Sequence, residues 1–235
     1  MSLNIKTTTN VEDPARYIAD SIIKKLGEGK KVLFFVTGGS SIAVGVKVCE
    51  FIVGKSVENL TILLTDERYG PLKHENSNWF RLVQNGFNIL GAMFIPILIG
   101  EGIISTTQKF NTILDQQLKI ADYKIGLFGI GKDGHTAGIL PESIAIESQD
   151  LASSYDTPIF VRITITPKTI EKLDEAVVWM QGEEKWSVVK DLIESDIPAR
   201  PHESSGAGGD LKEQPAQVLK KVPLLTIFTD YTCPV

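Results

Sequence analysis

The chain has 235 residues, of which 43% are hydrophobic and 23% are charged, and its formal net charge is −5. This composition is typical of a globular protein that is long enough to bury a full core, and it favours a single α/β domain over residues 1–235. The negative net charge argues against a general nucleic-acid partner, because such a protein needs a basic face.

The cysteines and the apolar runs narrow the class of protein further. Cys49 and Cys233 imply no disulfide framework, which suits a reducing compartment, and Cys49 is expected in the core. The first ten residues lack the apolar run of a signal peptide, and no run is long enough to span a bilayer. We therefore expect a cytoplasmic protein without a membrane partner.

Helix-like and strand-like runs alternate along the first half of the chain. Asp13 and Pro14 predict a helix start with the aspartate as N-cap, and Gly27 or Gly29 predicts its end. Residues 32–36 form an apolar run typical of a strand buried on both faces. The elements expected next are a helix ending near Val53, a strand at 60–64, a polar loop at 65–76, a helix at 77–90, a strand at 93–98 and a helix at 106–120.

The same alternation continues in the second half. The expected elements are strands at 125–128, 158–165, 176–180 and 224–228, and helices at 167–173 and 183–193. This βα alternation predicts a three-layer α/β fold, with a mainly parallel sheet and helices on both faces. Residues 199–214 contain a Ser/Gly-rich run, which indicates a surface insertion.

Residues 124–138 are the most informative stretch, because a predicted strand runs there into a glycine-rich turn. Gly129, Gly131 and Gly134 let the backbone approach a ligand closely, and Asp133 and His135 follow at the mouth. Histidine, with an ordinary pKa of about 6.5, is suited to proton transfer near neutral pH. The alternative is a tight turn with an incidental histidine.

The glycines also fit the G-x-G-x-x-G pattern of dinucleotide sites. That site needs a helix that opens at the third glycine and an acidic residue about twenty positions later. Pro141 ends any helix that starts at Gly134, so the sequence does not favour nucleotide binding.

Other polar residues follow predicted strands, and in an open α/β sheet ligands bind beyond the carboxyl ends of the strands. Gly38, Gly39 and Ser40 open a helix whose free N–H groups suit a phosphate, although a simply capped turn is the alternative. Lys185 lies in the first turn of a helix, where a bound anion would favour a cation. A solvated surface lysine is the alternative. No residues have metal-ligand spacing.

In order along the chain, these residues resemble those of the 6-phosphogluconolactonases. The shared motifs are residues 37–40, 65–68, 77–78, 129–137, 162–166 and 182–185. The resemblance spans nearly the whole chain and implies a Rossmann-like fold, which that family shares with glucosamine-6-phosphate isomerase/deaminases.

Two positions favour the lactonases over the deaminases. Leu140 stands where the deaminases carry a glutamate five residues past the motif histidine, and Arg68 stands where they carry a tyrosine. The chain departs from the usual lactonase pattern at Gly138, Ile139, Leu140 and Glu142. Glu142 is expected to add a negative charge near an anionic substrate.

The resemblance implies an enzyme that hydrolyses 6-phosphogluconolactone to 6-phosphogluconate, a step of the oxidative pentose phosphate pathway, without a metal or cofactor. It implies His135 as general base, Asp133 as the residue that orders the turn or orients the imidazole, and Arg68 or backbone N–H groups facing the oxyanion. A glucosamine-6-phosphate deaminase and a non-catalytic sugar-phosphate-binding protein are the alternatives.

The implied partner is a small phosphorylated sugar lactone, bound by a monomer or weak homo-oligomer. Its phosphate is expected on Gly38, Gly39, Ser40 and Lys185, with Arg162 adding charge unless that side chain points to solvent from a strand end. Asp66 and Asn78 complete the implied substrate-binding set.

Overall fold

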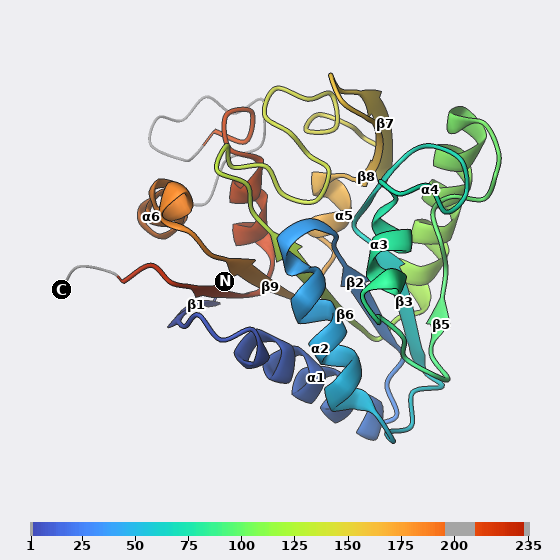
Figure 1. The fold of residues 1–235 in the computed structure, drawn as a ribbon, viewed down its shortest axis with the longest axis vertical. Coiled ribbons are helices and arrows are strands. Elements are labelled where there is room, and N and C mark those ends of the chain that lie inside the picture. The colour runs from blue at the N-terminus through green and yellow to red at the C-terminus, as the bar shows by residue number, and fades with distance from the viewer. Residues whose placement is uncertain (1, 196–209, 233–235) are drawn as a thin grey trace.

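A seven-stranded sheet forms the centre of the computed structural model, which describes residues 2–195 and 210–232 (Figure 1). All its pairings are parallel, in the order β1-β10-β9-β6-β2-β3-β5. The strands are β1 (Ser2–Thr7), β2 (Val32–Val36), β3 (Leu60–Leu64), β5 (Met93–Phe94), β6 (Tyr123–Gly129), β9 (Glu175–Met180) and β10 (Leu224–Thr229). Residues 199–209 of the predicted insertion lie outside the described residues.

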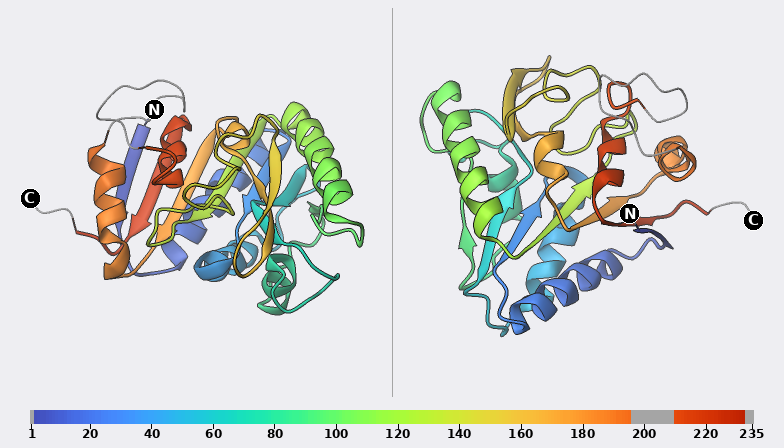
Figure 2. Two further views of the ribbon diagram at one scale, coloured as in Figure 1. Left: turned by 90° about the horizontal axis from the view of Figure 1, so that it is seen from above. Right: turned by 180° about the vertical axis from the view of Figure 1, so that it is seen from behind.

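Helices cover both faces of this sheet, so the predicted three-layer α/β class is confirmed (Figure 2). On one face lie α1 (Glu12–Gly27), α2 (Ile42–Ile52) and α3 (Asn78–Gln84), and on the other α4 (Ile103–Ile120) and α5 (Pro167–Ile170). The other helices are α6 (Trp186–Glu194) and the short 3-10 helices η1 (Gly39–Ser41), η2 (Glu183–Lys185) and η3 (Pro215–Lys221). Within the described ranges, no helix combines the length and apolar character needed to cross a membrane.

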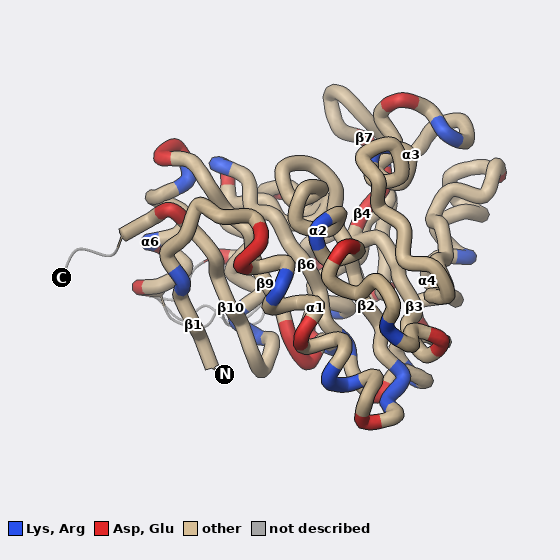
Figure 3. The backbone as a smooth tube through the Cα atoms, turned by 60° about the horizontal axis from the view of Figure 1, so that its bottom comes forward, with Lys and Arg blue, Asp and Glu red and all other residues tan. Residues whose placement is uncertain are grey.

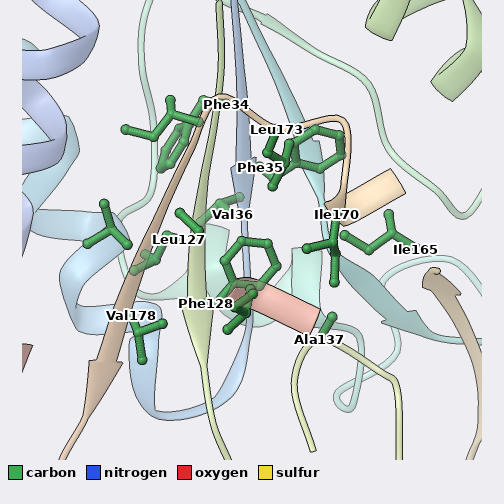
Figure 4. Close-up of a cluster of buried hydrophobic side chains, with 14 of the residues drawn as sticks. Phe34, Phe35, Val36, Leu127, Phe128, Ala137, Ile165, Ile170, Leu173 and Val178 are labelled. Atoms are coloured by element: carbon green, nitrogen blue, oxygen red, sulfur yellow. The ribbon is translucent and has the colours of Figure 1, made fainter. Parts of the chain in front are cut away.

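The core is built around β2, whose five residues are all buried. Phe34 and Phe35 point to opposite faces of the sheet and pack with side chains of β6 such as Leu127 and Phe128 (Figure 4). Cys49 is buried, as predicted, and burial raises the pKa of its thiol to about 11. Central strands packed on both faces give the turns that follow them a rigid base.

A second, antiparallel sheet has the order β4-β8-β7 and consists of β4 (Asp66–Arg68), β8 (Val161–Ile165) and β7 (Ala152–Asp156). The prediction of a loop over 65–76 is therefore wrong at its start, and the strand predicted at 158–165 begins at Val161 and belongs to this small sheet. The three residues of β4 are all charged, so they carry no hydrophobic pattern. Their strand exists because β8 pairs with them.

The start of α1 also differs from the prediction. The helix begins at Glu12, so Asp13 lies inside the first turn and is not the N-cap. The N-cap is Val11, which has no side-chain cap hydrogen bond, and the side chain of Asn10 before it accepts from the Glu12 N–H at 3.1 Å. The predicted end is confirmed, because α1 ends at Gly27.

Other elements also differ from the sequence pattern. Helix α3 ends at Gln84 rather than near residue 90, because Gly86 adopts a φ of 97° that a right-handed helix excludes. Strand β5 stops at Phe94, and Pro96 has no N–H with which to continue a ladder. The pattern does not predict β1, whose side chains are mostly exposed at the edge of the sheet.

Candidate active site

A pocket of about 180 Å³ opens beyond the carboxyl ends of β2, β6 and β9, between them and the β4–β8 pair. Its lining includes every predicted site residue except Asp133, namely Gly38, Gly39, Ser40, Asp66, Arg68, Asn78, His135, Arg162 and Lys185. Residues that the sequence does not single out as ligands also line it: Thr37, Gly129, Ile130, Gly131 and Ala137. The structure thus brings together residues from six separate stretches of the chain.

The glycine-rich turn after β6 is a compact loop, and no helix opens at Gly134. Within it the Gly131 N–H donates to the His135 carbonyl at 2.9 Å, and Gly134 adopts a φ of 78°. The Gly134 carbonyl accepts from the Ala216 N–H at 2.9 Å. The turn therefore lacks the helix that a dinucleotide site needs after its third glycine, as Pro141 predicts.

His135 and Asp133 form a pair at the mouth of the pocket. The Nδ1 atom of His135 lies 2.6 Å from Oδ1 of Asp133, which leaves Nε2 as the ring nitrogen available to a ligand or water. The imidazole also lies against Gly131, where an added Cβ would come within 2.2 Å of Nδ1, so a side chain at that position would displace the ring. Burial raises the pKa of Asp133, but the charge of His135 and its hydrogen bonds outweigh that effect and lower it overall.

The turn between β2 and α2 supplies another part of the pocket lining. Gly38 packs against the Asn78 amide so closely that an added Cβ would come within 2.2 Å of its Oδ1 atom, and Gly39 has a φ of 64°. Neither η1 nor α2 has a side-chain hydrogen bond at its N-cap. The Ile42 N–H at the start of α2 donates to the Gly39 carbonyl, so the backbone open to an external acceptor is that at the start of η1.

Two arginines face each other across the β4–β8 ladder, where Arg68 is the register partner of Arg162. The Arg68 guanidinium donates to the Asn76 carbonyl at 3.0 Å and lies over the Phe160 ring at 5.2 Å, and burial lowers its pKa. Arg162 is only 15% exposed, so the alternative that it points to solvent is wrong. Like charges directly opposite in a ladder are unfavourable unless an anion compensates them.

Asp66, which is 3% exposed, partly compensates the charge of the two arginines. Its Oδ2 atom lies 3.5 Å from the Arg162 guanidinium and accepts from the Asn78 amide at 3.1 Å. The Nε atoms of Arg68 and Arg162 and the Oδ1 atom of Asn78 are buried without a hydrogen-bond partner. Unpaired buried groups of this kind favour a ligand that completes them.

Lys185 ends η2 and lies at the N-cap of α6. Its side chain is half-buried in the pocket lining, and over residues 2–195 and 210–232 the ammonium makes no hydrogen bond or ion pair. A cation at a helix N-terminus is unfavourable on its own, so an anion in the pocket would stabilise this arrangement.

Glu67, which the sequence does not assign to the site, holds two of the segments that carry site residues. Its buried carboxylate accepts from the backbone N–H groups of Arg68 at 2.7 Å, Asn78 at 2.6 Å and Trp79 at 3.0 Å, and from the Ser77 hydroxyl at 2.9 Å. Burial raises the pKa of Glu67, and the four donors oppose that rise. This carboxylate therefore fixes the start of α3, and with it Asn78, against β4.

The departures from the lactonase pattern have local explanations. At Gly138 an added Cβ would lie 2.8 Å from Cβ of Thr164, whose hydroxyl accepts from the Gly138 N–H at 3.0 Å. The Leu140 N–H donates to the Tyr155 hydroxyl at 3.1 Å, and neither Leu140 nor Glu142 lines the pocket. Glu142 is exposed, and the expectation that it adds a negative charge near the substrate stays a prediction.

The fold and the pocket together define a Rossmann-like α/β protein with cationic side chains gathered around one histidine–aspartate pair. The chain belongs to the family described as glucosamine-6-phosphate isomerases/6-phosphogluconolactonase, whose family model matches residues 6–211. The family resemblance predicted from the ordered motifs is thereby confirmed. Across the described ranges, no group of three or more His, Cys, Asp or Glu side chains is arranged to hold a metal ion.

Individual relatives agree with this family. The 6-phosphogluconolactonase of Borreliella burgdorferi is 26% identical over 186 residues, which cover 71% of this chain and 70% of that protein. A crystal structure of a 6-phosphogluconolactonase from Shewanella baltica matches with a TM-score of 0.74 at 21% identity, covering 97% and 98% of the two chains. A monomeric glucosamine-6-phosphate deaminase matches with a TM-score of 0.75 at 18% identity, covering 97% of each chain. The fold is therefore common to both activities and does not separate them.

Replacing Glu67 with glutamine is expected to destabilise the protein, because an amide group would then face donors that now share two carboxylate oxygens. Each buried donor left unpaired costs about 1–3 kcal/mol. The free energy of unfolding, measured in urea, should fall by at least that amount. Glu75→Gln, at an exposed position of the following loop, is the matched control and should stay within about 0.5 kcal/mol of the parent. Equal stability of Glu67→Gln and the parent would contradict the capping role.

Proposed function

We propose that this protein is a 6-phosphogluconolactonase, which hydrolyses the ester bond of 6-phosphogluconolactone to give 6-phosphogluconate. The observation that carries the proposal is the His135–Asp133 pair at the mouth of a pocket that also holds Arg68, Arg162 and Lys185. A proton-transfer group beside clustered cations suits an anionic substrate that must be attacked by water. The names of the relatives support the same activity.

In the proposed reaction His135 acts as general base. Asp133 holds Nδ1, so Nε2 takes a proton from a water molecule whose oxygen attacks the lactone carbonyl carbon. The carbonyl π electrons move to its oxygen, and the resulting oxyanion is stabilised by Arg68 or by N–H groups of the glycine-rich turn. When the intermediate collapses, the bond to the ring oxygen breaks, and His135 returns the proton to that oxygen. The products are a carboxylic acid, which ionises, and a free hydroxyl.

The phosphate is proposed to bind at the β2–α2 turn and Lys185. The free backbone at Gly38, Gly39 and Ser40 and the unpaired ammonium of Lys185 supply the contacts, and Arg162 adds positive charge. Asp66 and Asn78 supply an acceptor and an amide for the sugar hydroxyls. The phosphate does not change charge during the reaction, so its contacts stabilise the bound substrate and the transition state about equally.

The deaminase activity is the second candidate, because a deaminase shares the fold and a curated deaminase from Lacticaseibacillus paracasei is 23% identical over 223 residues. We do not expect this chain to release ammonia from glucosamine 6-phosphate, because Leu140 has no carboxylate to tune the histidine and lies outside the pocket lining. The measurement is ammonia release against lactone hydrolysis under the same conditions. Comparable rates would reverse the assignment.

The variant His135→Asn should fold normally and lose hydrolysis. Removing a general base typically lowers kcat by about 10²–10⁴-fold. Turnover of 6-phosphogluconolactone must be measured above its spontaneous hydrolysis. The control is Lys132→Ala, an exposed residue of the same turn that does not line the pocket. A folded His135→Asn variant that retains more than half of the parent kcat would exclude His135 as the base.

The variant Lys185→Ala should raise KM for the phosphorylated lactone with little change in kcat. Loss of a charge-assisted hydrogen bond to the phosphate should raise this KM by roughly ten- to a hundred-fold. Unphosphorylated gluconolactone should be hardly affected, because it offers nothing to the ammonium. Lys190→Ala, an exposed residue of α6, is the matched control. Equal losses on both lactones would show that Lys185 does not bind the phosphate.

A further inference from the structure

The position of Lys185 depends on the short segment that carries it, residues 182–186 after β9. In the described part of the chain its ammonium has no partner, so no contact of its own holds it in the pocket. The segment makes a sharp turn, since Gly182 has a φ of 108° and the next three residues form η2. The Lys185 N–H closes this turn by donating to the Gly182 carbonyl at 2.9 Å, so a contact that ties the turn to the sheet must come from outside the segment.

Asp230, the first residue after β10, bonds both ends of that segment. Its Oδ2 atom accepts from the Gly182 N–H at 3.0 Å, and its Oδ1 atom accepts from the Trp186 indole N–H at 3.0 Å. One carboxylate thus spans Lys185, with one contact three residues before it and one directly after it. The Trp186 ring also meets the neighbouring Tyr231 edge to face at 5.9 Å between centroids.

Residues 182–186 and Asp230 both follow strands of the central sheet. β9 and β10 are parallel neighbours whose last residues, Met180 and Thr229, are register partners. The segment that leaves β9 and the carboxylate that leaves β10 therefore start from adjacent points at the same edge of the sheet.

We propose that Asp230 is a positioning residue for Lys185, holding residues 182–186 so that the ammonium lies in the pocket. This inference rests on the proposed role of Lys185 as a phosphate ligand. Asp230 does not line the pocket, so it acts on the substrate only through the turn.

The chemistry of the two contacts makes the proposal specific. Both oxygens of Asp230 face N–H donors, whereas asparagine offers one acceptor and one donor. In Asp230→Asn one donor therefore meets another donor, which loosens one end of the segment. Trp186→Phe removes one of the two donors. In that background the asparagine oxygen can accept from Gly182, and its NH₂ group faces no competing donor.

The experiment measures kcat and KM on 6-phosphogluconolactone and on unphosphorylated gluconolactone. Asp230→Asn should raise KM for the phosphorylated lactone by about ten-fold. This rise cannot exceed the one that Lys185→Ala causes by removing the ammonium, which is roughly ten- to a hundred-fold. Values on the unphosphorylated lactone should stay at the parent level. Asp122→Asn is the matched control, since that carboxylate also accepts from a backbone N–H, that of Lys31, at the opposite end of the sheet.

Two double variants test whether Asp230 acts through Lys185. Added to Lys185→Ala, Asp230→Asn should cause no further loss, because the effects of coupled residues are not additive. Added to Trp186→Phe, it should cause much less loss than in the parent. A full additional loss in the Lys185→Ala background, parent values for Asp230→Asn, or equal losses on both lactones would overturn the proposal.

The failures of the two proposals are distinguishable. If Lys185→Ala affects both lactones equally, the phosphate role fails, and the positioning role that rests on it fails too. If Lys185→Ala is selective for the phosphorylated lactone but Asp230→Asn is not, only the positioning role fails. Should Asp230→Asn not fold, Trp186→Phe removes one of the two bonds and keeps the carboxylate. Its KM for the phosphorylated lactone should then rise selectively, and an unchanged KM would overturn the proposal.

Discussion

The pairing of β4 with β8 places two guanidinium groups side by side, and most of the pocket is arranged around that concentration of charge. The chain as a whole is acidic, with a net charge of −5, and its acidic and basic residues are spread along the entire backbone (Figure 3). Only locally do Arg68, Arg162 and Lys185 gather around one cavity. Asp66 offsets part of this charge, and the Nε atoms of both arginines remain without partners. An anion in the pocket would compensate the positive charge that Asp66 leaves.

Much of this arrangement can be predicted from the sequence, because parallel strands place the residues that follow them at one edge of the sheet. The apolar runs identify β2, β3 and β6, and the turns after them supply His135 and Gly38 to the pocket. Pro141 correctly excludes a helix after the glycine-rich turn. Local patterns succeed here because each of these elements is buried on both faces, so its composition reflects its environment.

The sequence does not reveal contacts that depend on distant partners. The charges of Asp66 and Arg68 conceal the strand β4, which is visible only once β8 lies beside it. Glu67 resembles a solvated loop charge in sequence, yet it accepts four hydrogen bonds from its own backbone neighbour and the start of α3. Such roles are set by geometry after folding, and no spacing rule along the chain indicates them.

The position of β1 in the sheet has a consequence for the order of events during synthesis. Among the described residues this strand is at an edge of the sheet and pairs with β10, which lies far along the chain, since Ser2 is the register partner of Leu224. β1 therefore cannot join the sheet until β10 has been synthesised. The loop that carries His135 also depends on a later residue, since its Gly134 carbonyl accepts a hydrogen bond from the Ala216 N–H. A ribosome that stalls after α6 would therefore hold a chain in which β1 is unpaired and the loop of His135 lacks its bond to Ala216.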